Sequence, residues 1–293
     1  MTATATIRVG IAGWTFEPWR GEFYPKGLPQ KQELAFASAA LRTIEINSTF
    51  YGTQKPASFL SWAAQTPQSF VFTVKGPQLV THILKLRKAE TPLANFFASG
   101  PLALGARLGP FVWQLPPNLG FDAERIETFL ALLPQNPDAA GKLAAGHDER
   151  LKAPAFATIE GISTIRHAME VRHSSYADPA FLALLRKYNV ALVTADTPAW
   201  PTQDLTADFA YARLQGPPLE GRESYEGTEL DAWAARLEAW AKGKPAPAGP
   251  LVGSLEGAPK PRDVFAYFVS TDKLHAPKNA QAIMERLKLG PPG

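Results

Sequence analysis

The sequence predicts a (β/α)8 barrel, and three observations favour that fold class. Short runs rich in β-branched and aromatic residues alternate with helical patterns along almost the whole chain, which is typical of βα units and a parallel sheet. Eight such runs can be placed, and 293 residues suit one closed barrel. An open, doubly wound sheet loses its usual support because no Gly-x-Gly-x-x-Gly follows the first run and no phosphate-loop glycine–lysine motif occurs.

In chain order, the strands are expected at 7–14, 42–50, 70–76, 109–115, 166–173, 190–196, 209–215 and 264–270. Helices follow most of them, with the clearest patterns at 56–64, 123–133, 179–188, 229–242 and 277–287. Proline opens several of these helices, where its missing amide hydrogen costs nothing. We therefore expect one domain over residues 1–293.

Two segments interrupt the βα alternation. Residues 134–163 lie between the fourth and fifth strands and are expected to form an insertion that carries some helix. Residues 244–261 are rich in proline and glycine and are expected to form an irregular loop before the eighth strand.

Composition excludes several classes of site and partner. Cysteine is absent, which excludes disulfides, thiolate metal sites and a cysteine nucleophile. The first ten residues lack the pattern of a secretion signal, and no apolar stretch is long enough to span a bilayer, so we expect a cytoplasmic protein without a membrane partner. A net charge of +3 with dispersed lysine and arginine favours a small anionic ligand over nucleic acid.

Charged and polar side chains fall late in several expected strands. Parallel strands covered by helices are normally continuous hydrophobic runs, and strand residues alternate between the two faces of a sheet. The apolar set must face the helices, so the polar set should point into the barrel near its carboxyl end, where barrel enzymes place their chemistry. The polar set comprises Thr43, Glu45, Asn47, Thr73, Lys75, Gln114, Glu170, Arg172, Thr194, Asp196, Tyr211, Arg213 and Gln215.

A structural alternative remains open for these charges. Glu45 and Glu170 could simply neutralise the cations as an ion-pair lattice that packs the barrel. A purely structural lattice predicts that Glu170→Gln loses several kcal/mol of stability, whereas a functional site tolerates the change or gains stability.

Several motifs resemble the YecE-like (DUF72) family, a group of unknown function. The resemblance covers almost the whole chain and implies a TIM-type barrel, but no established reaction. Its motifs are Gly10-Ile11-Ala12-Gly13-Trp14, Trp19-Arg20-Gly21, Phe23-Tyr24-Pro25, Glu45-Ile46-Asn47-Ser48-Thr49-Phe50-Tyr51, Val74-Lys75-Gly76-Pro77, Gln114-Leu115-Pro116-Pro117, Glu170-Val171-Arg172-His173, Ala195-Asp196-Thr197-Pro198 and His275-Ala276-Pro277-Lys278-Asn279-Ala280.

The chain departs from the family pattern in two places. Members of the family usually read Arg-Leu-His-Gly after the seventh strand, whereas Gln215 stands here in the place of the histidine. The Asn/Asp-rich turn usual after the eighth strand is replaced by Val269-Ser270-Thr271-Asp272, which puts a carboxylate role for Ser270 in doubt.

Glu45 and Glu170 are the candidate general acid and base, since carboxylates in a partly desolvated pocket can be tuned toward neutral pKa values. Paired carboxylates also suit a glycosidase. Lys75 could form a Schiff base, although charge balance for Glu45 is the favoured interpretation.

The segment 275–279 is a candidate anion site, because the amino terminus of a helix offers free backbone amides and a favourable dipole. Lys278 and Arg213 would add positive charge. An ordinary helix that begins at a proline and carries a solvated lysine explains the segment equally well.

A metal site would need three or four of Glu45, Glu170, Asp196, His173 and His275, yet no compact metal-binding spacing is present, so we expect neither metal nor cofactor. The ends of the first two strands carry four aromatic residues that could form a platform for a sugar or a base. They are Trp14, Trp19, Phe50 and Tyr51. For Trp19 and Phe50, we favour a capping role over the barrel core.

These patterns predict an enzyme that acts on a small anionic or phosphorylated metabolite by acid–base chemistry. Glu45, Glu170 and Lys75 are the candidate catalytic residues. A metal-assisted hydrolase or isomerase, and a non-catalytic binder of a ligand or nucleic acid, are the alternatives. The candidate binding residues are Trp14, Asn47, Tyr51, Gln114, Arg172, Asp196, Arg213, Gln215, His275, Lys278 and Asn279.

Overall fold

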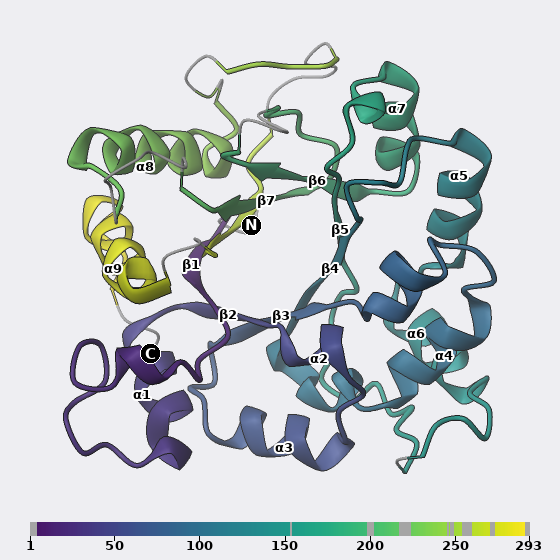
Figure 1. The fold of residues 1–293 in the computed structure, drawn as a ribbon, viewed down its shortest axis with the longest axis horizontal. Coiled ribbons are helices and arrows are strands. Elements are labelled where there is room, and N and C mark those ends of the chain that lie inside the picture. The colour runs from purple at the N-terminus through teal and green to yellow at the C-terminus, as the bar shows by residue number, and fades with distance from the viewer. Residues whose placement is uncertain are drawn as a thin grey trace.

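Eight parallel strands close into a barrel in the order in which they occur along the chain, with β1 pairing both β2 and β8. This computed structural model describes residues 5–152, 154–197, 202–216, 224–244, 246, 249–253, 260–269 and 273–290. Figure 1 shows the strands as a ring and the helices as an outer layer around it. The expected (β/α)8 barrel is confirmed.

All eight expected strands are present, and most are shorter than expected at their carboxyl ends. β2 stops at Ile46 because a helical turn, α2 (Ser48–Tyr51), begins two residues later. Ser270, the expected end of the last strand, lies outside the described residues. The strands are β1 Ile7–Ala12, β2 Thr43–Ile46, β3 Val71–Lys75, β4 Leu108–Gln114, β5 His167–Glu170, β6 Val190–Ala195, β7 Phe209–Leu214 and β8 Asp263–Phe268.

The outer layer contains the five expected helices together with α1, α4 and α6. The longer helices are α1 Glu33–Ala40, α3 Pro56–Ala64, α4 Glu90–Ala98, α5 Ala123–Leu132, α6 Pro137–Ala145, α7 Pro179–Lys187, α8 Gly227–Ala241 and α9 Ala276–Arg286. Shorter helical segments occur at η1 Glu17–Trp19, η2 Gln30–Gln32, η3 Leu79–Ile83, η4 Pro101–Arg107, η5 Ser174–Tyr176 and η6 Lys273–His275. Within the described ranges, no helix is both long and apolar enough to cross a membrane.

Side-chain caps explain where several helices begin. The carboxylates of Asp122 and Asp178 accept hydrogen bonds from backbone amides in the first turns of α5 and α7, and the Asn136 side chain does the same for α6. These caps satisfy amides that have no partner within the helix. Proline occupies the first turn of α3, α7 and α9, as the sequence predicts, and also that of α6.

The expected insertion between β4 and β5 contains α6, which packs against α4. Its start is held by a buried histidine. His167 contacts the carbonyl oxygen of Pro134 through Nε2 at 2.8 Å and accepts a hydrogen bond from Trp113 Nε1 at 3.2 Å. Burial lowers the pKa of His167 to about 4. This histidine is therefore neutral at pH 7 and joins the insertion to the outer face of the barrel.

The barrel interior changes in polarity along its axis. Apolar rings fill the amino-terminal part, where Phe209 and Phe265 contact each other. A layer of hydroxyl groups follows, in which Tyr267 OH lies 2.8 Å from Thr43 Oγ1 and 2.5 Å from Thr73 Oγ1. Charged side chains come last, at the ends of β2, β3, β5 and β7. The fold therefore places buried charge at the carboxyl end.

Candidate functional site

The centre of the site is an arginine held between two carboxylates. Arg213, from β7, donates to both oxygens of Glu45, with Nη2 2.9 Å from Oε1 and Nε 3.2 Å from Oε2. Its Nη1 donates a short hydrogen bond to Glu170 Oε2. All three side chains are at most 5% exposed. The carboxylates of β2 and β5 thus converge on one guanidinium inside the barrel.

Neighbouring side chains donate further hydrogen bonds to the oxygens of the same two carboxylates. Tyr211 OH donates to Glu45 Oε2 at 2.7 Å. Gln114 Nε2 and Arg172 Nε each donate to Glu170 Oε1, both at 2.9 Å. Arg172 is the most open member, with 38% of its side chain exposed. The alternation of strand residues therefore placed these side chains correctly.

Lys75 joins this network through an amide rather than a carboxylate. Its Nζ donates to Gln114 Oε1 at 3.0 Å and lies 4.3 Å from the centre of the Phe50 ring. Among the residues that the structure describes, no carboxylate lies within ion-pair distance of Nζ. Lys75 makes no ion pair with Glu45, because Arg213 occupies both oxygens of that carboxylate, but the charge of Glu45 still acts to raise the pKa of Lys75.

The charges of the site are tuned in opposite directions. Burial, assisted by the positive charge of Arg213, lowers the pKa of Lys75 to about 8. Burial alone would raise the pKa of Glu170, but Arg213 and Arg172 outweigh it and bring that pKa to about 2. The expectation of a near-neutral pKa is therefore wrong for Glu170. Lys75 is the group that changes charge near neutral pH.

His82 belongs to the surroundings of Lys75, although the sequence patterns did not select it. It lies in η3, the helical turn after β3, and its ring meets the Phe50 ring edge to face at 5.0 Å. Burial, followed by the charges of Lys75 and Arg172, lowers its pKa, so the imidazole is neutral at pH 7. The sequence feature that could have identified His82 is its position directly after an expected strand, in a segment at the carboxyl ends of the strands.

Two further predicted residues lie near the ends of the same strands. Asn47 follows β2, and its buried side-chain oxygen has no hydrogen-bond partner among the described residues. Gln215 follows β7 and is half-buried, and its backbone amide donates to Asp196. Asn47 therefore offers a free acceptor, while Gln215 is held by its backbone.

Asp196 does not join the central network, and the predicted orientation of β6 is wrong. Ala191 and Val193 are the β6 residues that fill the barrel interior, so Thr194 and Asp196 have the opposite orientation. The Asp196 carboxylate instead accepts hydrogen bonds from the Gln215 amide and from Tyr225 OH. It connects the ends of β6 and β7 to the segment before α8.

The predicted aromatic platform is not formed as expected. Trp14 follows Gly13, whose φ of +73° turns the chain, and its ring packs against Trp62 of α3 at 5.2 Å. Tyr51 is 74% exposed at the end of α2. Trp19 and Phe50 are buried, in agreement with their predicted capping role, and Phe50 also covers the Lys75 ammonium.

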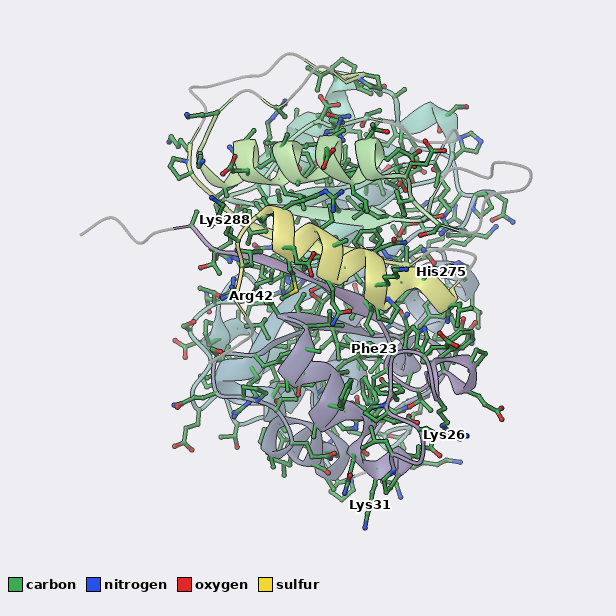
Figure 2. All side chains as sticks on the ribbon, turned by 90° about the vertical axis from the view of Figure 1, so that its left-hand side faces the viewer. Phe23, Lys26, Lys31, Arg42, His275 and Lys288 are labelled. Carbon is green, nitrogen blue, oxygen red and sulfur yellow. The ribbon has the colours of Figure 1, made fainter. Side chains whose placement is uncertain are left out.

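The segment 275–279 does not add cations to the central network. Lys278 is exposed and, with His275, lines a cavity of about 290 Å³ between α9 and residues 22–36. Figure 2 shows His275 near Phe23 at one end of α9 and Lys288 toward the other end. Asn279 is buried and accepts a hydrogen bond from Ser224 Oγ at 2.9 Å. Lys278 lines this cavity and Arg213 does not, so the two cations do not add their charge to one anion site as expected.

Of the side chains considered for a metal, Glu45 and Glu170 converge on Arg213, but the histidines and Asp196 do not join them. His173 accepts a hydrogen bond from the Ser175 amide and caps η5. In the described part of the chain, no three His, Asp or Glu side chains are grouped so that they could hold a metal ion. Pro198 and Asp272, which belong to the quoted motifs, lie outside the described residues.

Comparison with known proteins identifies the family. A family model described as a protein of unknown function, DUF72, matches residues 8–292. The chain belongs to the DUF72 family. The resemblance of its motifs to YecE-like proteins is thereby confirmed, and the match includes residues of all eight strands of this DUF72 protein.

Curated and solved relatives agree with that assignment. The UPF0759 protein YecE of Escherichia coli K12 is 30% identical over 115 residues, which cover 39% of this chain and 39% of YecE. A DUF72 family protein of Thermotoga maritima aligns over 97% of this chain and 99% of its own, with a TM-score of 0.71 and 24% identity. One from Enterococcus faecalis aligns over 97% and 96%, with a TM-score of 0.63 and 16% identity. The two structures establish a shared fold.

Proposed function

We propose that this DUF72 protein is an enzyme that acts on a small anionic metabolite, with Lys75 as the group that transfers protons. The observation that carries the proposal is the environment of the Lys75 amine. It is buried inside the carboxyl end of the barrel, and its hydrogen-bond partner is the neutral amide of Gln114. A group whose pKa is about 8 can both accept and donate protons near neutral pH.

The two carboxylates have a different role in this proposal. Glu170 stays ionised at neutral pH, because its pKa is about 2, so it cannot supply a proton. Both oxygens of Glu45 accept hydrogen bonds from Arg213. Glu45 and Glu170 therefore fix the guanidinium of Arg213, which balances one of their two negative charges, and Arg172 balances the other. The proton-transfer role that the sequence assigned to the carboxylates passes to Lys75.

Charge supports an anionic substrate. The network contains two carboxylates, Glu45 and Glu170, and three basic side chains, Lys75, Arg172 and Arg213. One positive charge therefore remains uncompensated when Lys75 is protonated. Arg172 is the most exposed of the three, since 38% of its side chain stays exposed while it binds Glu170. An incoming carboxylate or phosphate would meet this guanidinium first.

Incubation of a mixture of carboxylated and phosphorylated metabolites with the protein tests this proposal. We expect the wild type to consume an anionic compound and the Lys75→Met variant to leave it unchanged. The consumed compound should bind Arg172→Ala at least about tenfold more weakly, because a charge-assisted hydrogen bond is lost. Mass spectrometry and isothermal titration calorimetry measure the two effects.

Lys278→Ala is the matched control, since Lys278 is an exposed basic side chain on the outer surface. Its affinity for the compound should equal that of the wild type. Equal weakening in both variants would show that general surface charge binds the anion. Consumption by Lys75→Met at the wild-type rate would overturn the role of Lys75.

A further inference from the structure

We infer that Lys75 forms an imine with its substrate, which places the substrate among small anionic aldehydes and ketones. The inference rests on the proposed function and goes further, because it turns the amine from a proton carrier into a nucleophile. Its basis is the way in which the amine is held, rather than the presence of a lysine at a strand end.

The hydrogen bonding of Lys75 suits a nucleophile. An ammonium in contact with a carboxylate is stabilised in its charged form and has no lone pair, whereas the amide oxygen of Gln114 accepts one N–H and contributes no net charge. Glu45 and Glu170 are both engaged by Arg213, which keeps them from pairing with Nζ. A neutral amine can keep this hydrogen bond and still direct its lone pair at a carbonyl carbon.

The surroundings of the amine favour the neutral form and exclude water. Phe50 shields Nζ from water, and the Lys75 residue is only 7% exposed. The ring face of Phe50 by itself attracts the ammonium, so burial and Arg213 are what favour the neutral form. Arg213 lies in the same network and repels a second positive charge. Desolvation and a neighbouring cation are the two means by which proteins activate lysine for attack on carbonyls. Both operate at this position.

The charges of the site define the rest of the substrate. Imine formation needs a carbonyl carbon at Nζ, and Arg172 offers an exposed guanidinium joined to Lys75 through Glu170 and Gln114. A carboxylate or phosphate on the same small molecule would bind there. The compound class is therefore an oxoacid or a sugar phosphate in its open-chain form.

The proposed step balances without an oxidant or reductant. The lone pair of Nζ attacks the carbonyl carbon, and the carbonyl oxygen takes a proton to give a carbinolamine. The carbon–oxygen bond then breaks as the oxygen takes a second proton and leaves as water. In sum, an ammonium and a carbonyl give a protonated imine and one water. The two protons that the oxygen takes are the two that the nitrogen loses, so the step needs no outside source of protons.

Borohydride trapping tests the inference. The whole protein is incubated at pH 8 with pyruvate or with dihydroxyacetone phosphate, reduced with sodium borohydride, and examined by intact-mass and peptide mass spectrometry. We expect one stable adduct per chain at Lys75 with at least one of these probes. Inorganic phosphate should compete with it. The adduct should fall at least about tenfold in Lys75→Met and persist in Lys278→Met, since only the first variant removes the buried amine.

The outcomes separate this inference from the proposed function. An adduct spread over surface lysines, or one that persists in Lys75→Met, would overturn the imine. Binding of the probes to the wild type without a trapped adduct would also overturn the imine and would leave acid–base chemistry on an anion intact. If neither the probes nor phosphate binds and no adduct forms, both proposals fail.

Discussion

Replacing Lys75 with methionine should stabilise the protein by about 1–2 kcal/mol at pH 7 while abolishing activity. The fall in pKa from the ordinary 10.5 to about 8 means that burying the charged amine costs about 3 kcal/mol at neutral pH. Methionine removes that cost at similar volume, and the lost hydrogen bond to Gln114 offsets about 1–2 kcal/mol of the gain. Urea unfolding measures the difference.

The gain should depend on pH in a defined direction. Between pH 8 and 10.5 the folded wild type binds fewer protons at Lys75 than the unfolded chain does, so its stability rises with pH. The methionine variant lacks this rise, and the difference between the two proteins should shrink over that range. A loss of several kcal/mol at pH 7 would instead identify Lys75 as a structural member of an ion-pair lattice. Lys278→Met, at an exposed position, should change stability little.

Replacing Arg213 with methionine should have the opposite effect, a loss of about 3–5 kcal/mol at pH 7. The change leaves the buried carboxylates of Glu45 and Glu170 without the guanidinium that binds both. The pKa of Glu170 would then rise from its wild-type value, because only Arg172 and Lys75 would remain to oppose the effect of burial. Urea unfolding at several pH values, with circular dichroism to show that the barrel is retained, measures the effect.

The pH dependence again gives a direction that can be checked. In the wild type, the lowered pKa of Glu170 contributes stability that is present above about pH 4.5 and is lost as the pH falls toward 2. In the variant, protonation of a buried carboxylate removes its unpaired charge. The decrease in the free energy of unfolding that the substitution causes should therefore become smaller as the pH falls. A loss that is independent of pH would contradict the role given to Arg213.

Arg166→Met provides a matched control at the amino end of the barrel. Arg166 binds Asp263 at 2.7 Å and approaches Asp208 at 3.8 Å, but these carboxylates are 25% and 60% exposed. Water can solvate both after the guanidinium is removed, so we expect a loss below about 2 kcal/mol. Equal losses in the two variants would mean that burial of the carboxylates does not matter.

The barrel and most of its charged interior could be predicted because strand alternation constrains them. In β2, β5 and β7 the carboxylate and guanidinium side chains share one face of the strand, and the opposite face carries apolar residues that must pack against the helices. Glu45, Glu170 and Arg213 lie inside the barrel for this reason. In β6 both faces are apolar up to Thr194, and the same rule cannot tell which side faces the helices. Asp196 was therefore assigned to the wrong side.

The rule also fails where the strand ends. The turn at Gly13 redirects Trp14 toward α3, and the helical turn after Ile46 places Tyr51 on the surface. Lys278 points outward because its orientation follows the packing of α9. Sequence patterns also could not show which cation binds which carboxylate. That pairing decides that Lys75, rather than Glu170, changes charge near neutral pH.

The most direct test of the site is a pH titration of the Lys75 amine by nitrogen-detected NMR on lysine-labelled protein. The Lys75→Met variant assigns the signal. We expect a midpoint near 8 and a change in the signal when an anionic substrate or inorganic phosphate is added. A midpoint at the ordinary value of 10.5, unaffected by anions, would contradict a reactive buried amine at the mouth of this barrel.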